Sequence, residues 1–142
     1  MAVGPTVKKL MSAYPGKLRL VIKNYPYKYR DYSHLAAEAT LAAGEQGKYW
    51  EMHDLLLIKS PKLDRTSLIG YAKDLGLDTN KFTTDLDNMK HAQAIERDKK
   101  LAVDLDLYNT PTFFINGRKL VGDRPIKQFT QIIDEELLRE KR

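Results

Sequence analysis

The spacing of apolar positions changes along the chain, and each change predicts a different secondary-structure element. Between residues 5 and 14 the apolar side chains recur at helical spacing: Val7, Leu10, Met11 and Tyr14. Residues 18–23 instead alternate, with Leu18, Leu20 and Ile22 on one side, which predicts a β-strand. Because Pro15 and Gly16 lie between these patterns, the chain is expected to open with a helix followed by a strand.

From Ser33 to about Leu107 the pattern is helical and is interrupted only by short turns. Polar residues that favour helix starts precede three of the apolar runs: Ser33, Asp64 and Asp78. Glycines that favour helix ends follow two of them: Gly44 and Gly76. This stretch therefore predicts a block of several helices.

The stretch NTPTFFINGRKLVG, residues 109–122, predicts a β-hairpin. Two short apolar runs flank Asn116-Gly117, a pair typical of two-residue hairpin turns, and Thr110-Pro111 precedes the first run. A last helix is expected from Pro125, with an apolar stripe formed by Ile126, Phe129, Ile133 and Leu137. The order is that of an α/β protein, but three strands are few for the apolar surface of the flanking helices.

Composition removes several kinds of chemistry. The 142 residues include no cysteine, so they cannot by themselves form a disulfide, exchange thiols or bind zinc through thiolates. The three histidines, His34, His53 and His91, fall on different predicted helices, and none forms the i, i+4 pair of a helical metal site. Gly-X-Ser-X-Gly and phosphate-loop motifs are absent. We therefore expect no catalytic residue, no metal and no cofactor.

Charge and hydropathy limit the range of partners. The net charge of +5 is spread along the chain, so nucleic acid is not expected as a partner. The stretch YPYKYRDY combines aromatic and basic residues, as surfaces for single-stranded nucleic acid do, but structural packing beside a solvated surface is the favoured interpretation. No apolar run approaches the roughly 18 residues of a membrane span, and no export signal is visible.

Three stretches together resemble the DsbA-like thioredoxin-fold oxidoreductases, in particular their simpler bacterial branch. They are PTVKKLMSAYPGKLRLVIKNYP, HLAAEATLAAGEQGKYWEMHDLLL and TPTFFINGRKLVGDRPIKQFTQIIDEEL, and they occur in the order of that family. The resemblance implies an α/β thioredoxin-like fold with an all-helical insertion. Residues 1–30 and 108–142 would form the thioredoxin-like half domain, and residues 31–107 the insertion.

One departure from the family changes the functional prediction. Family members carry a strand and a Cys-X-X-Cys turn before the helix that begins here at Pro5, and only MAVG precedes it. We interpret the chain as N-terminally truncated, without the central strand that the family places between residues 18–23 and 113–116. Three compensations are open: direct antiparallel pairing of these two segments, a paired or domain-swapped dimer, or a strand supplied by another polypeptide.

The resemblance also implies a binding loop. At the position of Pro111 the family has a cis-proline, and the backbone of the residue before it, here Thr110, holds an extended substrate. The preferred interpretation is a shortened, redox-silent member of the disulfide oxidoreductase family. The alternatives are a cysteine-free module that binds an extended peptide or protein strand, and a structural homodimer. Family resemblance suggests a periplasmic or extracytoplasmic location, which nothing in the sequence tests.

Overall fold

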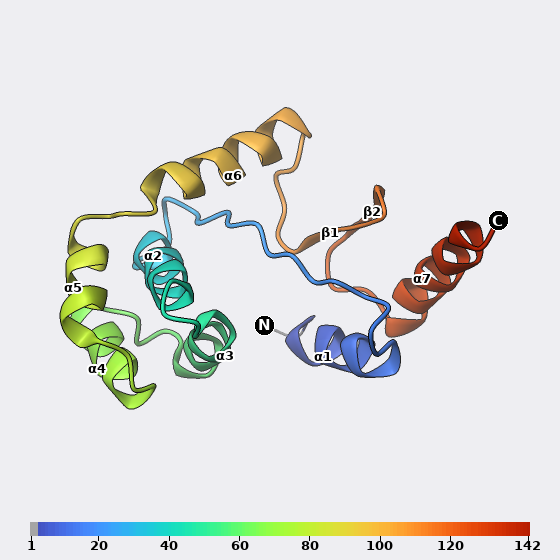
Figure 1. Ribbon diagram of the computed structural model, residues 1–142. Coiled ribbons are helices and arrows are strands. Elements are labelled where there is room, and N and C mark those ends of the chain that lie inside the picture. The colour runs from blue at the N-terminus through green and yellow to red at the C-terminus, as the bar shows by residue number, and fades with distance from the viewer. Residues whose placement is uncertain (1–2) are drawn as a thin grey trace. The chain divides into compact units, whose positions relative to one another are not determined.

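The computed structural model describes residues 3–142, which contain seven helices and two strands (Figure 1). Met1 and Ala2, the start of the MAVG leader, lie outside the described residues. The chain forms two compact units, one made of Met1–Ile22 with Asp106–Arg142 and the other of Lys23–Leu105. The predicted insertion boundaries at residues 31 and 107 stay a prediction.

The first unit packs two helices against a β-hairpin. Helix α1 (Val3–Ala13) and helix α7 (Ile126–Glu140) enclose a small core of Leu10, Phe129 and Ile133. Phe113 of the hairpin meets Phe129 edge to face, with ring centroids 5.0 Å apart, a favoured aromatic geometry. The hydroxyl of Tyr14 also donates a 2.7 Å hydrogen bond to Asp134, so the end of α1 is tied to α7.

The predicted hairpin is confirmed. Strand β1 (Thr112–Ile115) pairs antiparallel with strand β2 (Arg118–Val121). The two turn residues both have positive φ, 48° at Asn116 and 85° at Gly117. Such a type I′ turn matches the twist of two strands joined by two residues, and Asn-Gly adopts it at little steric cost. The sequence therefore set both the turn and the pairing register.

The predicted strand at residues 18–23 is wrong, because among residues 3–142 no strand pairs with this segment. Its burial still alternates as the sequence indicated: Leu18, Leu20 and Ile22 are half-buried, while Val21 is 59% exposed. Side-chain alternation reflects which face meets the core, whereas a strand also needs a neighbour for its backbone hydrogen bonds. The direct antiparallel pairing considered above does not form in residues 3–142.

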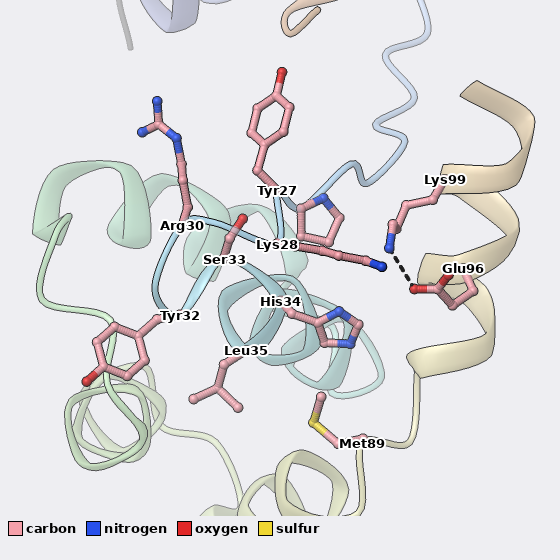
Figure 2. Close-up of a pocket in the computed structure, with 11 residues that line it drawn as sticks. Tyr27, Lys28, Arg30, Tyr32, Ser33, His34, Leu35, Met89, Glu96 and Lys99 are labelled. Carbon is pink, nitrogen blue, oxygen red and sulfur yellow. Dashed lines mark hydrogen bonds and ion pairs between the residues drawn. The ribbon is translucent and has the colours of Figure 1, made fainter. Parts of the chain in front are cut away.

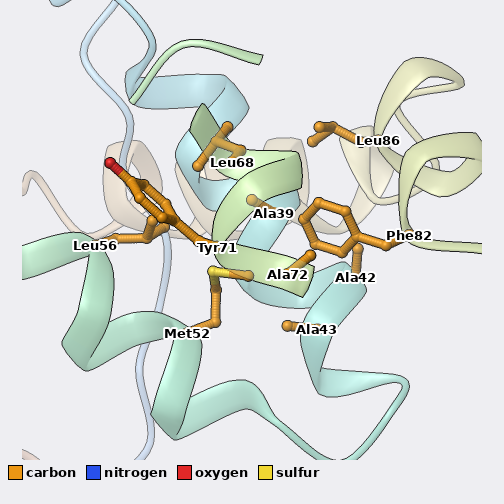
Figure 3. Packing of buried hydrophobic residues seen from close by; sticks show 10 residues of the cluster. All are labelled: Ala39, Ala42, Ala43, Met52, Leu56, Leu68, Tyr71, Ala72, Phe82 and Leu86. Atoms are coloured by element: carbon orange, nitrogen blue, oxygen red, sulfur yellow. The ribbon is translucent and has the colours of Figure 1, made fainter. Parts of the chain in front are cut away.

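The second unit is the predicted helical block. Its five helices are α2 (Ser33–Gly44), α3 (Tyr49–Lys59), α4 (Arg65–Asp74), α5 (Thr79–Asp87) and α6 (Ala92–Asp104). Alanines of α2 let Met52, Phe82 and other large side chains approach its backbone closely, and Figure 3 shows them gathered around that helix. This close approach gives a tightly packed core without a sheet.

Two of the three predicted N-caps are confirmed. The carboxylates of Asp64 and Asp78 accept 3.0 Å hydrogen bonds from the backbone N–H of Ser67 and Lys81, three residues into their helices. The prediction for Ser33 is wrong. Tyr32 takes the cap position of α2 with a φ of 61° and makes no side-chain cap, and Ser33 is the first helical residue.

Truncation of Phe82 should destabilise the protein strongly, because its side chain is fully buried among the helices. We expect Phe82→Ala to lower the free energy of unfolding by about 3–5 kcal/mol. The matched control is Ile58→Ala in α3, where the side chain is 77% exposed and the expected change is under about 0.5 kcal/mol. Urea denaturation followed by circular dichroism measures both, and equal losses would contradict the packing described here.

Candidate functional site

The loop before β1 carries the two residues that the sequence singled out. The Thr110-Pro111 peptide bond is cis. Two hydrogen bonds fix the loop: Thr112 Oγ1 donates to the carbonyl of Asn109 at 2.7 Å, and the N–H of Gly122 donates to the carbonyl of Pro111 at 2.8 Å. Thr110 is exposed and Pro111 is half-buried at the start of the hairpin. The structure therefore places both residues at one end of β1.

Strand β1 has one edge that β2 does not cover. A two-residue turn makes Ile115 and Arg118 a hydrogen-bonded pair, and pairs along an antiparallel ladder alternate. Phe113 and Leu120 are then hydrogen-bonded as well, which leaves the backbone groups of Thr112 and Phe114 pointing away from β2. Among residues 3–142 no backbone partner meets this outer edge. The edge can accept a further strand.

Residues 18–22 provide a second unpaired backbone in the same unit. Leu18 packs against the core that also holds Phe113 and Ile115. No backbone–backbone hydrogen bond from residues 18–22 reaches another part of the described chain. Residues 18–22 and β1 thus contribute side chains to one core, while residues 18–22 and the outer edge of β1 have no backbone partner among the described residues. A β-sheet presents this combination where a strand is absent.

Helix α7 holds the hairpin in position through β2. Arg118 of β2 donates a 2.6 Å hydrogen bond to Glu135 of α7. This contact raises the pKa of Arg118 and, together with a hydrogen bond from Gln131, lowers the pKa of Glu135. Glu136, which is buried, lies 3.1 Å from Arg139 and 3.6 Å from Arg118. The outer edge of β1 is therefore presented by a hairpin that α7 anchors.

The structure brings two of the three histidines to one carboxylate. His34 Nε2 lies 3.6 Å from Glu38 Oε1, and the backbone N–H of His91 donates to Glu38 Oε2 at 2.9 Å. His53 instead packs against the rings of Tyr49 and Trp50. Sequence reasoning missed Glu38, since a single glutamate in an alanine-rich helix carries no signal of its own.

Across residues 3–142 no three His, Asp or Glu side chains come together as a metal site. None of the described helices has the length and apolar character that crossing a bilayer requires.

Comparison with known proteins now settles the family. A family model described as thioredoxin matches residues 2–135. The chain belongs to this thioredoxin family. A thioredoxin-like oxidoreductase from Silicibacter pomeroyi DSS-3 shares 30% identity with a TM-score of 0.83, over 95% of this chain and 77% of that one.

Two further solved structures support the DsbA-like fold. The thiol-disulfide exchange protein alpha-DsbA2 from Wolbachia pipientis has 25% identity and a TM-score of 0.82, covering 94% of this chain and 73% of that one. The oxidoreductase DsbA from Xylella fastidiosa, at 19% identity and a TM-score of 0.70, covers 96% of this chain and 78% of that one and shows the fold alone. The resemblance to DsbA-like proteins is confirmed, and this thioredoxin-family chain contains no cysteine.

Curated relatives are much longer proteins. A Na⁺/H⁺ antiporter NhaA from Herminiimonas arsenicoxydans is 35% identical over 125 residues, which are 88% of this chain and 20% of that protein. A Na⁺/H⁺ antiporter NhaA 1 from Salinispora arenicola is 37% identical over 130 residues, 91% of this chain and 20% of that protein. The chain thus spans about a fifth of the length of these relatives.

Amide hydrogen exchange should show which N–H groups of β1 point away from β2. We expect the N–H groups of Thr112 and Phe114 to exchange faster than those of Phe113 and Ile115, because only the latter pair with β2. The difference should be about tenfold or more at each position when followed by two-dimensional NMR. Equal protection of all four amides in the dilute chain would show that the outer edge is already occupied.

Proposed function

We propose that this thioredoxin-like protein accepts an extended polypeptide strand along the outer edge of β1, beside Thr110 and Pro111. The observation that carries the proposal is the unpaired edge itself, since the backbone of Thr112 and Phe114 faces away from β2. Strand addition to such an edge gains main-chain hydrogen bonds, and alternate side chains of the added strand supply specificity.

The neighbouring core favours an occupant with alternating apolar side chains. Residues 18–22 and β1 each present apolar positions to the core around Phe129, and apolar side chains also lie on exposed faces, with Val21 59% and Phe114 46% exposed. A strand with apolar residues at every second position would extend this core and remove part of that apolar surface from water. The gain is about 25 cal/mol for each Å² buried.

Thiol–disulfide exchange is proposed only for an assembly that brings thiols from elsewhere. These 142 residues contain no cysteine, so by themselves they cannot exchange thiols. The similarity to the Silicibacter oxidoreductase and to the Wolbachia thiol-disulfide exchange protein motivates the link. An added strand that carried a cysteine pair would restore the missing chemistry, whereas one without thiols would make the protein a binding module.

A peptide titration tests strand acceptance directly. The ¹⁵N-labelled chain is titrated with a seven-residue peptide of alternating Val and Thr, which should slow amide exchange at Thr112 and Phe114. The same peptide N-methylated at alternate residues loses the donors of one edge, so it should bind more weakly. Binding that is equal for both peptides would contradict pairing through the backbone.

A pair of variants separates the backbone donor from the side chain. Phe114→Pro removes the outward N–H without touching the ladder to β2, and proline is tolerated at such edge positions. Phe114→Ala loses the same ring but keeps the N–H. We expect Phe114→Pro to bind the peptide about fivefold or more weakly than Phe114→Ala. Equal affinities, with the hairpin intact by NMR, would overturn the proposed site.

Self-association is a separate outcome of the same experiment. If a second copy of the chain covers the edge, sedimentation velocity should show a dimer that Phe114→Pro shifts to monomer. The alternating peptide should then compete with dimerisation. A monomer at all concentrations that still binds the peptide supports the strand-accepting function alone.

A further inference from the structure

The helical unit contains a cavity that the β1 edge does not involve. It has a volume of about 410 Å³ and is built from the tyrosine-rich connection before α2, the first turn of α2, and α6 (Figure 2). Its apolar wall includes Pro26, Leu35 and Met89. Residues of the stretch YPYKYRDY thus line this cavity, and the proposed binding of a strand at β1 gives them no role.

Positive side chains converge in this cavity on one carboxylate. Lys99 Nζ donates a 2.9 Å hydrogen bond to Glu96 Oε1, and Figure 2 shows the ammonium group of Lys28 directed toward the same carboxylate. The hydrogen bond from Lys99 lowers the pKa of Glu96, and the charges of His34 and Lys28 act in the same direction. Two lysine ammonium groups, Lys28 from the connection before α2 and Lys99 from α6, therefore face a single anion position.

Lys99 is the unusual member of this group. Its side chain is only 18% exposed, whereas its partner Glu96 is 60% exposed. An ammonium group has three donors, and Glu96 is the one side chain with which Lys99 pairs in the described part of the chain. Because this half-buried lysine has a single, exposed carboxylate partner, it retains donors for another anion.

His34 is held in place by the helix that carries it. Glu38, one turn later in α2, is fully buried, and its Oε1 atom has no hydrogen-bond partner among the described residues. That atom lies 3.6 Å from His34 Nε2. Glu38 offsets the charge that His34 gains on protonation, so the positive charge that faces Glu96 comes from Lys28 and Lys99.

We propose that this cavity binds a small phosphate monoester with an aromatic or alkyl body. Once a ligand displaces the Glu96 carboxylate, Lys28 and Lys99 together present two positive charges to it. A phosphate monoester carries about −1.5 to −2 at pH 7, which matches these two charges, and the apolar wall accommodates its body. The carboxylate of Glu96 occupies the position that the phosphate takes, and the ligand displaces it.

Substitutions on α6 test this arrangement in opposite directions. Phenyl phosphate is titrated into the full chain by calorimetry, with inorganic phosphate and benzyl alcohol as separate arms. Lys99→Gln should weaken phenyl phosphate binding about tenfold or more, because it removes a charge-assisted hydrogen bond. Glu96→Gln should strengthen binding about two- to fivefold, because it removes the competing carboxylate.

Two further variants complete the test. Lys28→Gln, at an exposed position outside the helices, should also weaken binding and guards against a folding defect in Lys99→Gln. Lys100→Gln is the matched control, since Lys100 is a neighbour in α6 that pairs with Asp104 and does not line the cavity. Its affinity should equal that of the unchanged chain.

The three ligand arms decide between the possible results. Tighter binding of phenyl phosphate than of either inorganic phosphate or benzyl alcohol supports the monoester. The proposal is overturned if inorganic phosphate binds as tightly, if benzyl alcohol binds as tightly, or if no ligand binds. It is also overturned if Glu96→Gln weakens binding, and none of these results bears on strand acceptance at β1.

Discussion

Backbone hydrogen bonding at the outer edge of β1 is the constraint on which the first unit depends. The hairpin satisfies one edge of β1 through β2, and α7 holds it in place through Arg118 and Glu135. The opposite edge has no partner in residues 3–142, and residues 18–22 have none either. Since an unpaired group costs about 1–3 kcal/mol when it is buried, this edge must stay in contact with water or meet another strand. The proposed function is the second alternative, in which another strand pairs with this edge.

The helical unit solves the same problem without any partner. Helices satisfy their backbone internally, and α2 brings its alanines against Met52, Phe82 and Leu86 to complete a core. This unit therefore needs no added strand for its stability. The anion-binding cavity lies entirely on this unit. Anion binding there therefore does not depend on whether a strand adds to β1.

Local sequence was a good guide wherever local geometry decides structure. Asn116-Gly117 fixed the hairpin turn, and Asp64 and Asp78 capped their helices as predicted. It failed at Ser33, because the cap position depends on the path of the preceding connection, which places Tyr32 there instead. Local sequence also could not predict the contacts of Glu38 or the approach of Lys28 to Lys99, since these residues meet only when separate segments pack together.

The sequence by itself determined the helices, the hairpin, the family resemblance and the absence of thiol chemistry within these residues. Each follows from neighbouring residues or from composition, and needs no knowledge of how distant segments meet. Tertiary structure alone decided that residues 18–22 remain unpaired, although their apolar alternation is that of a strand. The physical reason is that alternation is a property of one segment, whereas a strand exists only when a second backbone supplies its hydrogen bonds.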